Sequence, residues 1–333
     1  MKNTLVKSLN GMGIGLFATL VVGTIIVQFG TLVEVEIFIM LGNFAKIFMG
    51  GAIGAAVAYF LGSSPLVIFS CIVTGSIGAG AIKSVDGSMI LGVGDPAGAY
   101  IAAILTVLLG NLVAGKTKVD ILLTPMICIL FGGIVGINIS PIISEFVGVI
   151  GNIINKATEM QPLYMGAIIS TIMGLVLVSP ISSAALATSL GLEGLAAGAA
   201  VVGCSCQMIG FAVISYKENG VEGFIAQGIG TAKIQFGNIV KNIYIVIPTV
   251  ISSLLLGMLS TTLFKISSNS IGAGMGTSGL VGQIQTFVVM GKESLISIIL
   301  TQLILPAIVS YLVFIFLKKR SFIKDGDMLI EKI

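Results

Sequence analysis

ILLTPMICILFGGIVGINISPI, residues 121–142, runs for 22 positions without a charged side chain. About 20 residues at a rise of 1.5 Å cover the roughly 30 Å hydrocarbon core of a bilayer, so this stretch has the length of a membrane-spanning helix. Backbone polar groups inside lipid must be paired within the segment, which favours helices. Eight further stretches qualify or nearly do: 11–30, 38–62, 66–82, 97–115, 163–179, 195–216, 244–262 and 295–317. The sequence therefore predicts an all-α polytopic protein of the cytoplasmic membrane with about nine spans.

The composition excludes several classes of function. Only 9% of the residues are charged, there is no His and no Trp, and Arg320 is the single arginine. Histidine catalysis and histidine metal sites are therefore excluded, and nucleic-acid binding would need a clustered basic face that the chain lacks. The cysteines all lie in apolar stretches and are interpreted as packing residues: Cys71, Cys128, Cys204 and Cys206. We expect no enzymatic activity, no cofactor and no metal.

The few charges predict the topology. Lys2 and Lys7 precede the first span, and the run 318–320 follows the last one, so the positive-inside rule places both termini in the cytoplasm. A crossing at 195–216 would however leave Lys217 outside. Lys217 returns to the cytoplasmic side if a neighbouring stretch is re-entrant, entering and leaving the membrane on the same side. The candidate is SPISSAALATSLG (residues 179–191), which is polar and interrupted by a proline.

Similar short motifs recur in the two halves of the chain. MGGAI at 49–53 is followed by Pro65, and YMGAI at 164–168 is followed by Pro180; 14 residues separate Gly51 from Pro65 and Gly166 from Pro180. This order predicts one domain over 1–333 with an ancient duplication of 10–120 and 121–246, followed by the C-terminal span 295–317. Repeats with broken helices near the membrane midplane are typical of secondary transporters.

A family resemblance emerges in the second half. TPMICILFGGIVGINISPIISEFVGVIGNII (124–154) and LYMGAIISTIMGLVLVSPISSAALA (163–187) resemble the EIIC membrane component of fructose-type sugar phosphotransferase systems. A motif of that family similar to DMGGPVNKAA falls on 176–185, and its hairpin motif GITEGAIPF falls on 228–236. In length the chain is most similar to the stand-alone branch that includes the perfringolysin O regulator family. The resemblance implies a homodimer and, for sugar transport, separate soluble phosphotransferase subunits.

The departures from these motifs concern charge. The family's Asp and Lys fall on Val176 and Ser183, and its hairpin Glu falls on Thr231, while Lys233 adds a cation. Charged groups at membrane depth are costly and are kept for contacts with substrates or ions. The change of sign therefore predicts an anionic or acceptor-rich solute, and it predicts that Lys233→Gln weakens binding while folding stays intact.

The candidate solute-binding residues are polar side chains beside the breaks or inside apolar spans. Each also has a purely structural alternative. Asp95 before Pro96 fits a helix cap, and serines beside Pro180 can satisfy local backbone. Gln207 can join helices, and residues 231–238 can form a cytoplasmic loop. The glycine-rich stretch 272–283 lacks the ending of a phosphate loop and is interpreted as a re-entrant or lid loop. The candidates are Asp95, Ser179, Ser182, Ser183, Gln207, Thr231, Lys233, Gln235, Asn238, Thr277 and Ser278.

Three functions fit these observations. The first is a transporter, or a binding protein derived from one, for a small polar and anionic solute. The second is a sugar permease of the phosphotransferase type, working with separate soluble subunits. The third is a membrane-embedded sensor that binds a solute without moving it.

Overall fold

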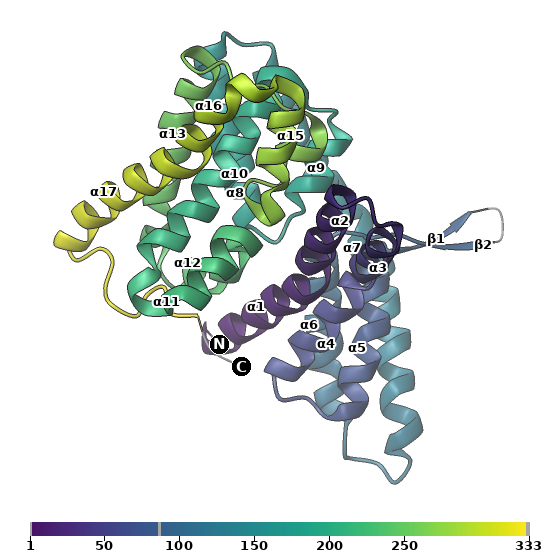
Figure 1. Cartoon of the computed structure of the whole chain (residues 1–333). Helices are drawn as coiled ribbons and strands as arrows, with labels where there is room; N and C mark the ends of the chain where they lie inside the picture. Colours follow the sequence, from purple (N-terminus) through teal and green to yellow (C-terminus); the bar gives the residue numbers. More distant parts are fainter. Residues whose placement is uncertain (1, 86–87, 331–333) are drawn as a thin grey trace. The chain divides into compact units, whose positions relative to one another are not determined.

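The computed structural model describes residues 2–85 and 88–330. Contacts divide the chain into two compact units, Met1–Phe146 and Val147–Ile333, which are described separately. Almost every described residue outside the turns is helical, and the one sheet is a two-stranded hairpin of β1 (Ile82–Val85) and β2 (Ser88–Leu91) (Figure 1). The all-α fold class is confirmed.

The first unit is built from six helices and the beginning of a seventh. A π-helical turn, Phe17–Val21, joins the first two, and the unit contains α1 (Lys2–Leu16), α2 (Val22–Leu32), α3 (Glu36–Ile47), α4 (Met49–Phe60), α5 (Pro65–Gly78), α6 (Pro96–Val113) and the start of α7 (Asp120–Thr158).

The second unit continues from α7 and contains more breaks. Its helices are α8 (Pro162–Val178), α9 (Ser183–Ser189), α10 (Gly194–Ile214), α11 (Tyr216–Ile225), α12 (Phe236–Lys241), α13 (Ile247–Thr262), α14 (Ser270–Ala273), α15 (Val281–Met290), α16 (Leu295–Ile299) and α17 (Leu305–Lys319). Short turns of π or 3-10 type lie between them: η2 (Ala226–Gly230), η3 (Ala232–Gln235), η4 (Ile243–Val246), η5 (Ser278–Leu280), η6 (Lys292–Ser294) and η7 (Leu300–Ile304).

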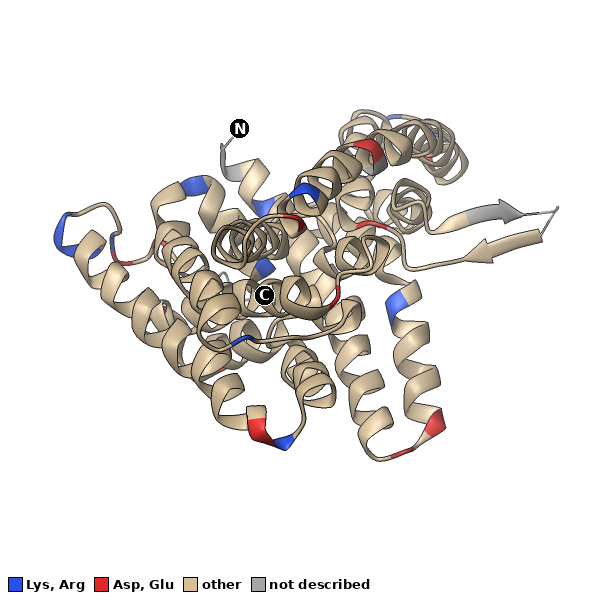
Figure 2. Cartoon of the chain, turned by 90° about the horizontal axis from the view of Figure 1, so that it is seen from above, with Lys and Arg blue, Asp and Glu red and all other residues tan. Residues whose placement is uncertain are grey.

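Apolar helices account for all nine predicted stretches. Among the described residues, six helices are long and apolar enough to cross a membrane, or seven if α3 and α4, bent by 51°, form one span. The stretches 66–82 and 163–179 correspond to the shorter apolar helices α5 and α8. Prolines occupy the first helical positions of both, where a missing N–H costs nothing. Charged residues gather at helix ends and in loops, between long uncharged stretches (Figure 2).

Close backbone contacts between helices hold the second unit together. A Cβ added at Gly203 of α10 would lie 1.9 Å from the Ser170 carbonyl oxygen of α8, and one at Gly257 of α13 would lie 2.3 Å from the Gly166 carbonyl oxygen. In lipid, helices associate through such close packing, because lipid tails are as apolar as leucine. These glycines let α8, α10 and α13 form the core of the unit.

The two proline positions of the proposed repeat have different surroundings. Pro65 opens α5, whereas Pro180 lies in a break between α8 and the seven-residue α9. The predicted discontinuity at 179–191 is therefore a true helix break. The duplication itself stays a prediction.

Candidate functional site

Helix α8 ends in a break caused by Pro180. A proline has no N–H to donate to the carbonyl four residues earlier, which here is that of Val176. The Ser179 hydroxyl donates to this carbonyl oxygen at 2.8 Å instead, and Ser179 itself has extended backbone, with ψ 171°. After the break, the Ser182 hydroxyl accepts from the Ala185 N–H and begins α9. Two predicted site residues thus terminate and restart the helix.

Lys233 reaches this break from another part of the unit. Its ammonium group donates to the carbonyl oxygens of Ser179 at 2.6 Å and Ile181 at 2.5 Å, and more weakly to that of Val176 at 3.4 Å. The side chain is only 5% exposed. A cation is stabilised near the carbonyl end of a helix by the helix dipole. An ammonium group carries three protons, and these three carbonyls match them in number.

Thr231 fixes the start of the turn that carries Lys233. It lies in extended conformation between the π turn η2 and the 3-10 turn η3, and its hydroxyl accepts from the Lys233 N–H at 3.3 Å. The turn is therefore capped by a neutral hydroxyl group. This hydrogen bond fixes the backbone position from which the Lys233 side chain extends to the break.

The glycine-rich stretch completes the assembly. The Ser183 hydroxyl donates to the Gly274 carbonyl oxygen at 2.7 Å, and the Thr277 hydroxyl donates to the Gly228 carbonyl oxygen of η2. A Cβ on Gly274 would lie 2.2 Å from the Ser183 carbonyl oxygen, so glycine is required there. We call residues 179–183, 226–235 and 272–280 the broken-helix junction. It includes eight of the predicted site residues: Ser179, Ser182, Ser183, Thr231, Lys233, Gln235, Thr277 and Ser278.

Gln235 and Asn238 face the end of the chain instead. The Gln235 amide donates to Met328 O at 2.9 Å and to Gln227 Oε1 at 3.0 Å. The Asn238 amide donates to Gln235 Oε1 at 2.8 Å and to Leu329 O at 3.0 Å. Both side chains are nearly fully buried. They connect the junction to the C-terminal residues.

The remaining two predicted residues lie elsewhere. Gln207 of α10 accepts from the Thr249 hydroxyl of α13 at 2.6 Å and donates to the Ser253 hydroxyl at 3.3 Å, which is the helix-joining alternative. Asp95 belongs to the first unit, where its carboxylate accepts from the Ala97 N–H at 2.8 Å and caps α6. The geometry gives both residues structural contacts.

Sequence reasoning missed a second polar cluster. Gln283 of α15 donates to Gln302 Oε1 at 2.9 Å, and the Gln302 amide donates to the Thr286 hydroxyl at 3.3 Å. The side-chain oxygen of Gln283 is buried without a hydrogen-bond partner. Gln302 lies in the π turn η7, and π turns are frequent at functional sites. The sequence signal that could have revealed this cluster was a glutamine inside an apolar stretch.

A surface pocket of about 500 Å³ lies outside the junction. It is lined by the end of α7, the beginning of α8 and the segment before α10, including Asn155, Thr158 and Glu193. None of the predicted site residues lines it.

Comparison with known proteins agrees with the architecture. The family model described as "Phosphotransferase system, EIIC" matches residues 6–330. A search of curated proteins finds no match. The fructose-type assignment and the stand-alone branch stay predictions. Because the family match covers nearly the whole chain, this multi-pass cell-membrane protein belongs to the EIIC family of the phosphotransferase system, whose members are membrane transport components for sugars.

Proposed function

We propose that the chain binds an uncharged, polyhydroxylated solute of the sugar class at the broken-helix junction and moves it across the membrane together with separate soluble phosphotransferase subunits. The observation that carries this proposal is the Lys233 ammonium group, which donates to the carbonyl oxygens of Ser179 and Ile181 in the break after α8. We also propose that the chain forms one EIIC domain and acts as a homodimer.

The contacts of Lys233 change the solute class predicted from the sequence. An anionic solute would have to draw the ammonium group away from the Ser179 and Ile181 carbonyls, leaving those acceptors unpaired at a cost of roughly 1–3 kcal/mol each. Other polar side chains of the junction are uncharged and include the hydroxyls of Thr231, Thr277 and Ser278. Hydroxyls and carbonyls can exchange hydrogen bonds with sugar hydroxyls without leaving a charge unpaired. A neutral solute therefore fits the junction better.

Uptake by purified protein tests the proposal. Proteoliposomes would be given radiolabelled neutral sugars, sugar acids and sugar phosphates, with and without the soluble phosphotransferase subunits encoded in the same cell. We expect saturable uptake of a neutral sugar, and recovery of a sugar phosphate when the subunits and phosphoenolpyruvate are present. Preference for an anionic solute would contradict the proposed solute class, and binding without uptake would support the sensor alternative instead.

A pair of threonine variants connects the uptake to the junction. Thr231→Val removes a junction hydroxyl, whereas Thr262→Val removes an exposed hydroxyl that donates to the Met258 carbonyl oxygen at the end of α13. We expect the first variant to lose solute affinity and the second to match the parent. Equal affinity in both variants would place the solute elsewhere.

The homodimer has a direct test. Native mass spectrometry of the protein in lipid discs should give twice the 34.3 kDa mass of the chain. A monomer mass at all protein concentrations would refute this part of the proposal.

A further inference from the structure

The last described residues form an irregular segment that packs onto the second unit. Residues 321–330, which we call the C-terminal strap, contain turns but no helix. Within this segment Met328 is 0% exposed and Ile323 is 2% exposed. The yellow end of the chain leaves α17 and passes along α11 (Figure 1). A short non-helical segment thus buries two apolar side chains.

Side chains of α11 hold the backbone of the strap. Glu218 of α11 accepts from the Met328 N–H at 2.9 Å. Asn219 donates to the Met328 carbonyl at 2.8 Å and accepts from the Ile330 N–H at 2.8 Å. The amides of Gln235 and Asn238 add to these by donating to the carbonyl oxygens of Met328 and Leu329, respectively. Such bonds fix the position of the strap's main chain rather than recognise its side chains.

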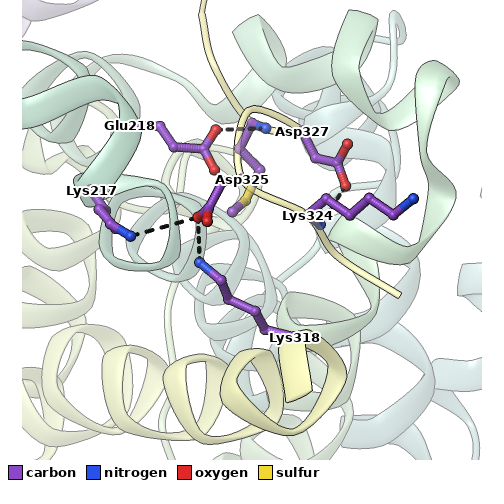
Figure 3. A network of polar contacts seen from close by, with 7 residues as sticks. Lys217, Glu218, Lys318, Lys324, Asp325 and Asp327 are labelled. Atoms are coloured by element: carbon purple, nitrogen blue, oxygen red, sulfur yellow. Dashed lines mark hydrogen bonds and ion pairs between the residues drawn. The ribbon is translucent and has the colours of Figure 1, made fainter. Parts of the chain in front are cut away.

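The outer part of the strap is held by charge. The Asp325 carboxylate contacts the Lys318 ammonium group at 2.5 Å and lies 3.8 Å from that of Lys217, as Figure 3 shows. The hydrogen bond with Lys318 holds the pKa of Asp325 below its usual value of 3.8, and the charge of Lys217 adds to this effect. These groups are solvent-exposed, so the attraction is weak and is screened by salt. The outer attachment can therefore break while the inner one persists.

The inner attachment is shared with the broken-helix junction. Gln235 follows Lys233 by two residues, and its amide group contacts both the strap and Gln227, the residue before Gly228. Gly228 in turn accepts from Thr277 of the glycine-rich stretch. The strap is thus joined through side chains to two of the three segments of the junction.

We propose that the C-terminal strap is a latch that holds the segment η2–η3–α12 in place and must be released for solute to cross. This inference rests on the proposed function, because it assigns regulation to the same junction. The strap suits such a role, since it has no helix to unfold and buries few side chains. Its release would free the amides of Gln235 and Asn238 and detach the segment η2–η3–α12 from the strap.

A reversible cross-link tests the latch, because it replaces the two hydrogen bonds between the Asn219 side chain and the strap's main chain with a covalent bridge. Asn219→Cys combined with Leu329→Cys places two thiols where the Asn219 side chain now bridges Met328 O and Ile330 N. A short thiol-reactive cross-linker that a dithiol can cleave would join the two cysteines in proteoliposomes. The four native cysteines are buried, and the two single variants, treated alike, control for their reaction.

Two measurements then decide the question. We expect cross-linking to lower solute uptake at least tenfold, and a reducing agent to restore it. We also expect hydrogen exchange of amides 226–241 to be slower in the cross-linked protein and faster in a variant that ends at Arg320. Unchanged uptake in the cross-linked protein would overturn the latch.

The two proposals fail in different ways. If neither the linked nor the reduced protein takes up any tested sugar, the proposed function fails, and hydrogen exchange alone then decides the latch. Equal exchange of amides 226–241 in the linked and reduced proteins would overturn it. This readout needs no solute, and it does not depend on whether the truncated variant folds.

Discussion

The ammonium group of Lys233 is buried against the end of a broken helix, so its removal should lower stability, in contrast to the intact folding that the sequence alone predicted for Lys233→Gln. Lys233→Met would leave the carbonyls of Ser179 and Ile181 without their donor. Buried unsatisfied acceptors cost about 1–3 kcal/mol each, so we expect a clearly lower melting temperature in detergent. The matched control is Lys319→Met, because Lys319 is exposed. Equal melting temperatures would mean that the ammonium group does not stabilise the break.

Glycines of α10 provide a second prediction at the scale of the residue. Gly203→Ala would push a Cβ to 1.9 Å from the Ser170 carbonyl oxygen, against backbone that cannot move easily. Overpacking of this kind costs roughly 1–3 kcal/mol, so we expect thermal unfolding at a lower temperature. Gly148→Ala is the control, because nothing lies within 4 Å of its added Cβ. That variant should be neutral or slightly more stable, since alanine favours helix.

Single residues also show where prediction from the sequence ends. Polarity drew attention to Gln207 inside an apolar stretch and to Lys233 in a polar segment between two apolar stretches. Their partners, Thr249 on α13 and the carbonyls after α8, are 42 and about 54 positions away, and no local pattern specifies such distant contacts. The sequence could predict the sign of the charge on Lys233, but it could not predict which carbonyl oxygens accept hydrogen bonds from its ammonium group.

At the scale of the element, one hydroxyl connects the glycine-rich stretch to the π turn η2. Thr277→Val keeps the shape of the side chain and leaves the Gly228 carbonyl without its donor. We expect faster hydrogen exchange of amides 226–230 and a loss of about 1–3 kcal/mol in stability. Thr262→Val serves again as the control, because its hydroxyl is exposed. Unchanged exchange would show that the two segments are held together by other contacts.

Helix breaks were the most predictable elements. Proline chemistry placed discontinuities near Pro65 and Pro180, and the structure has a helix start at the first and a gap at the second. The bend between α3 and α4 was not expected, because residues 38–62 are almost uniformly apolar and Phe48 carries no turn chemistry. The C-terminal strap was also missed, since its buried Met328 belongs to a sequence that resembles an ordinary charged tail.

For the whole molecule, the strap resolves a difficulty in the predicted topology. Charge counting left Lys217 on the opposite side of the membrane from the basic run that follows α17. Asp325 contacts both Lys217 and Lys318, so the ends of α10 and α17 lie at the same face of the second unit. The re-entrant stretch that corrects the number of membrane crossings must therefore precede α10 in the sequence.

This shared face gives a sharp test of orientation. Cysteines at Lys217 and Lys319 should both react with a membrane-impermeant maleimide only in inside-out vesicles, because the basic run is predicted to be cytoplasmic. Glu293 lies at the other end of the continuous helical stretch Lys292–Lys319, which is long enough to cross a bilayer. A cysteine there should react only in right-side-out vesicles. Labelling of the Lys217 and Lys319 positions from opposite sides would contradict the ion pairs of Asp325, whereas labelling of both from outside would invert the predicted topology.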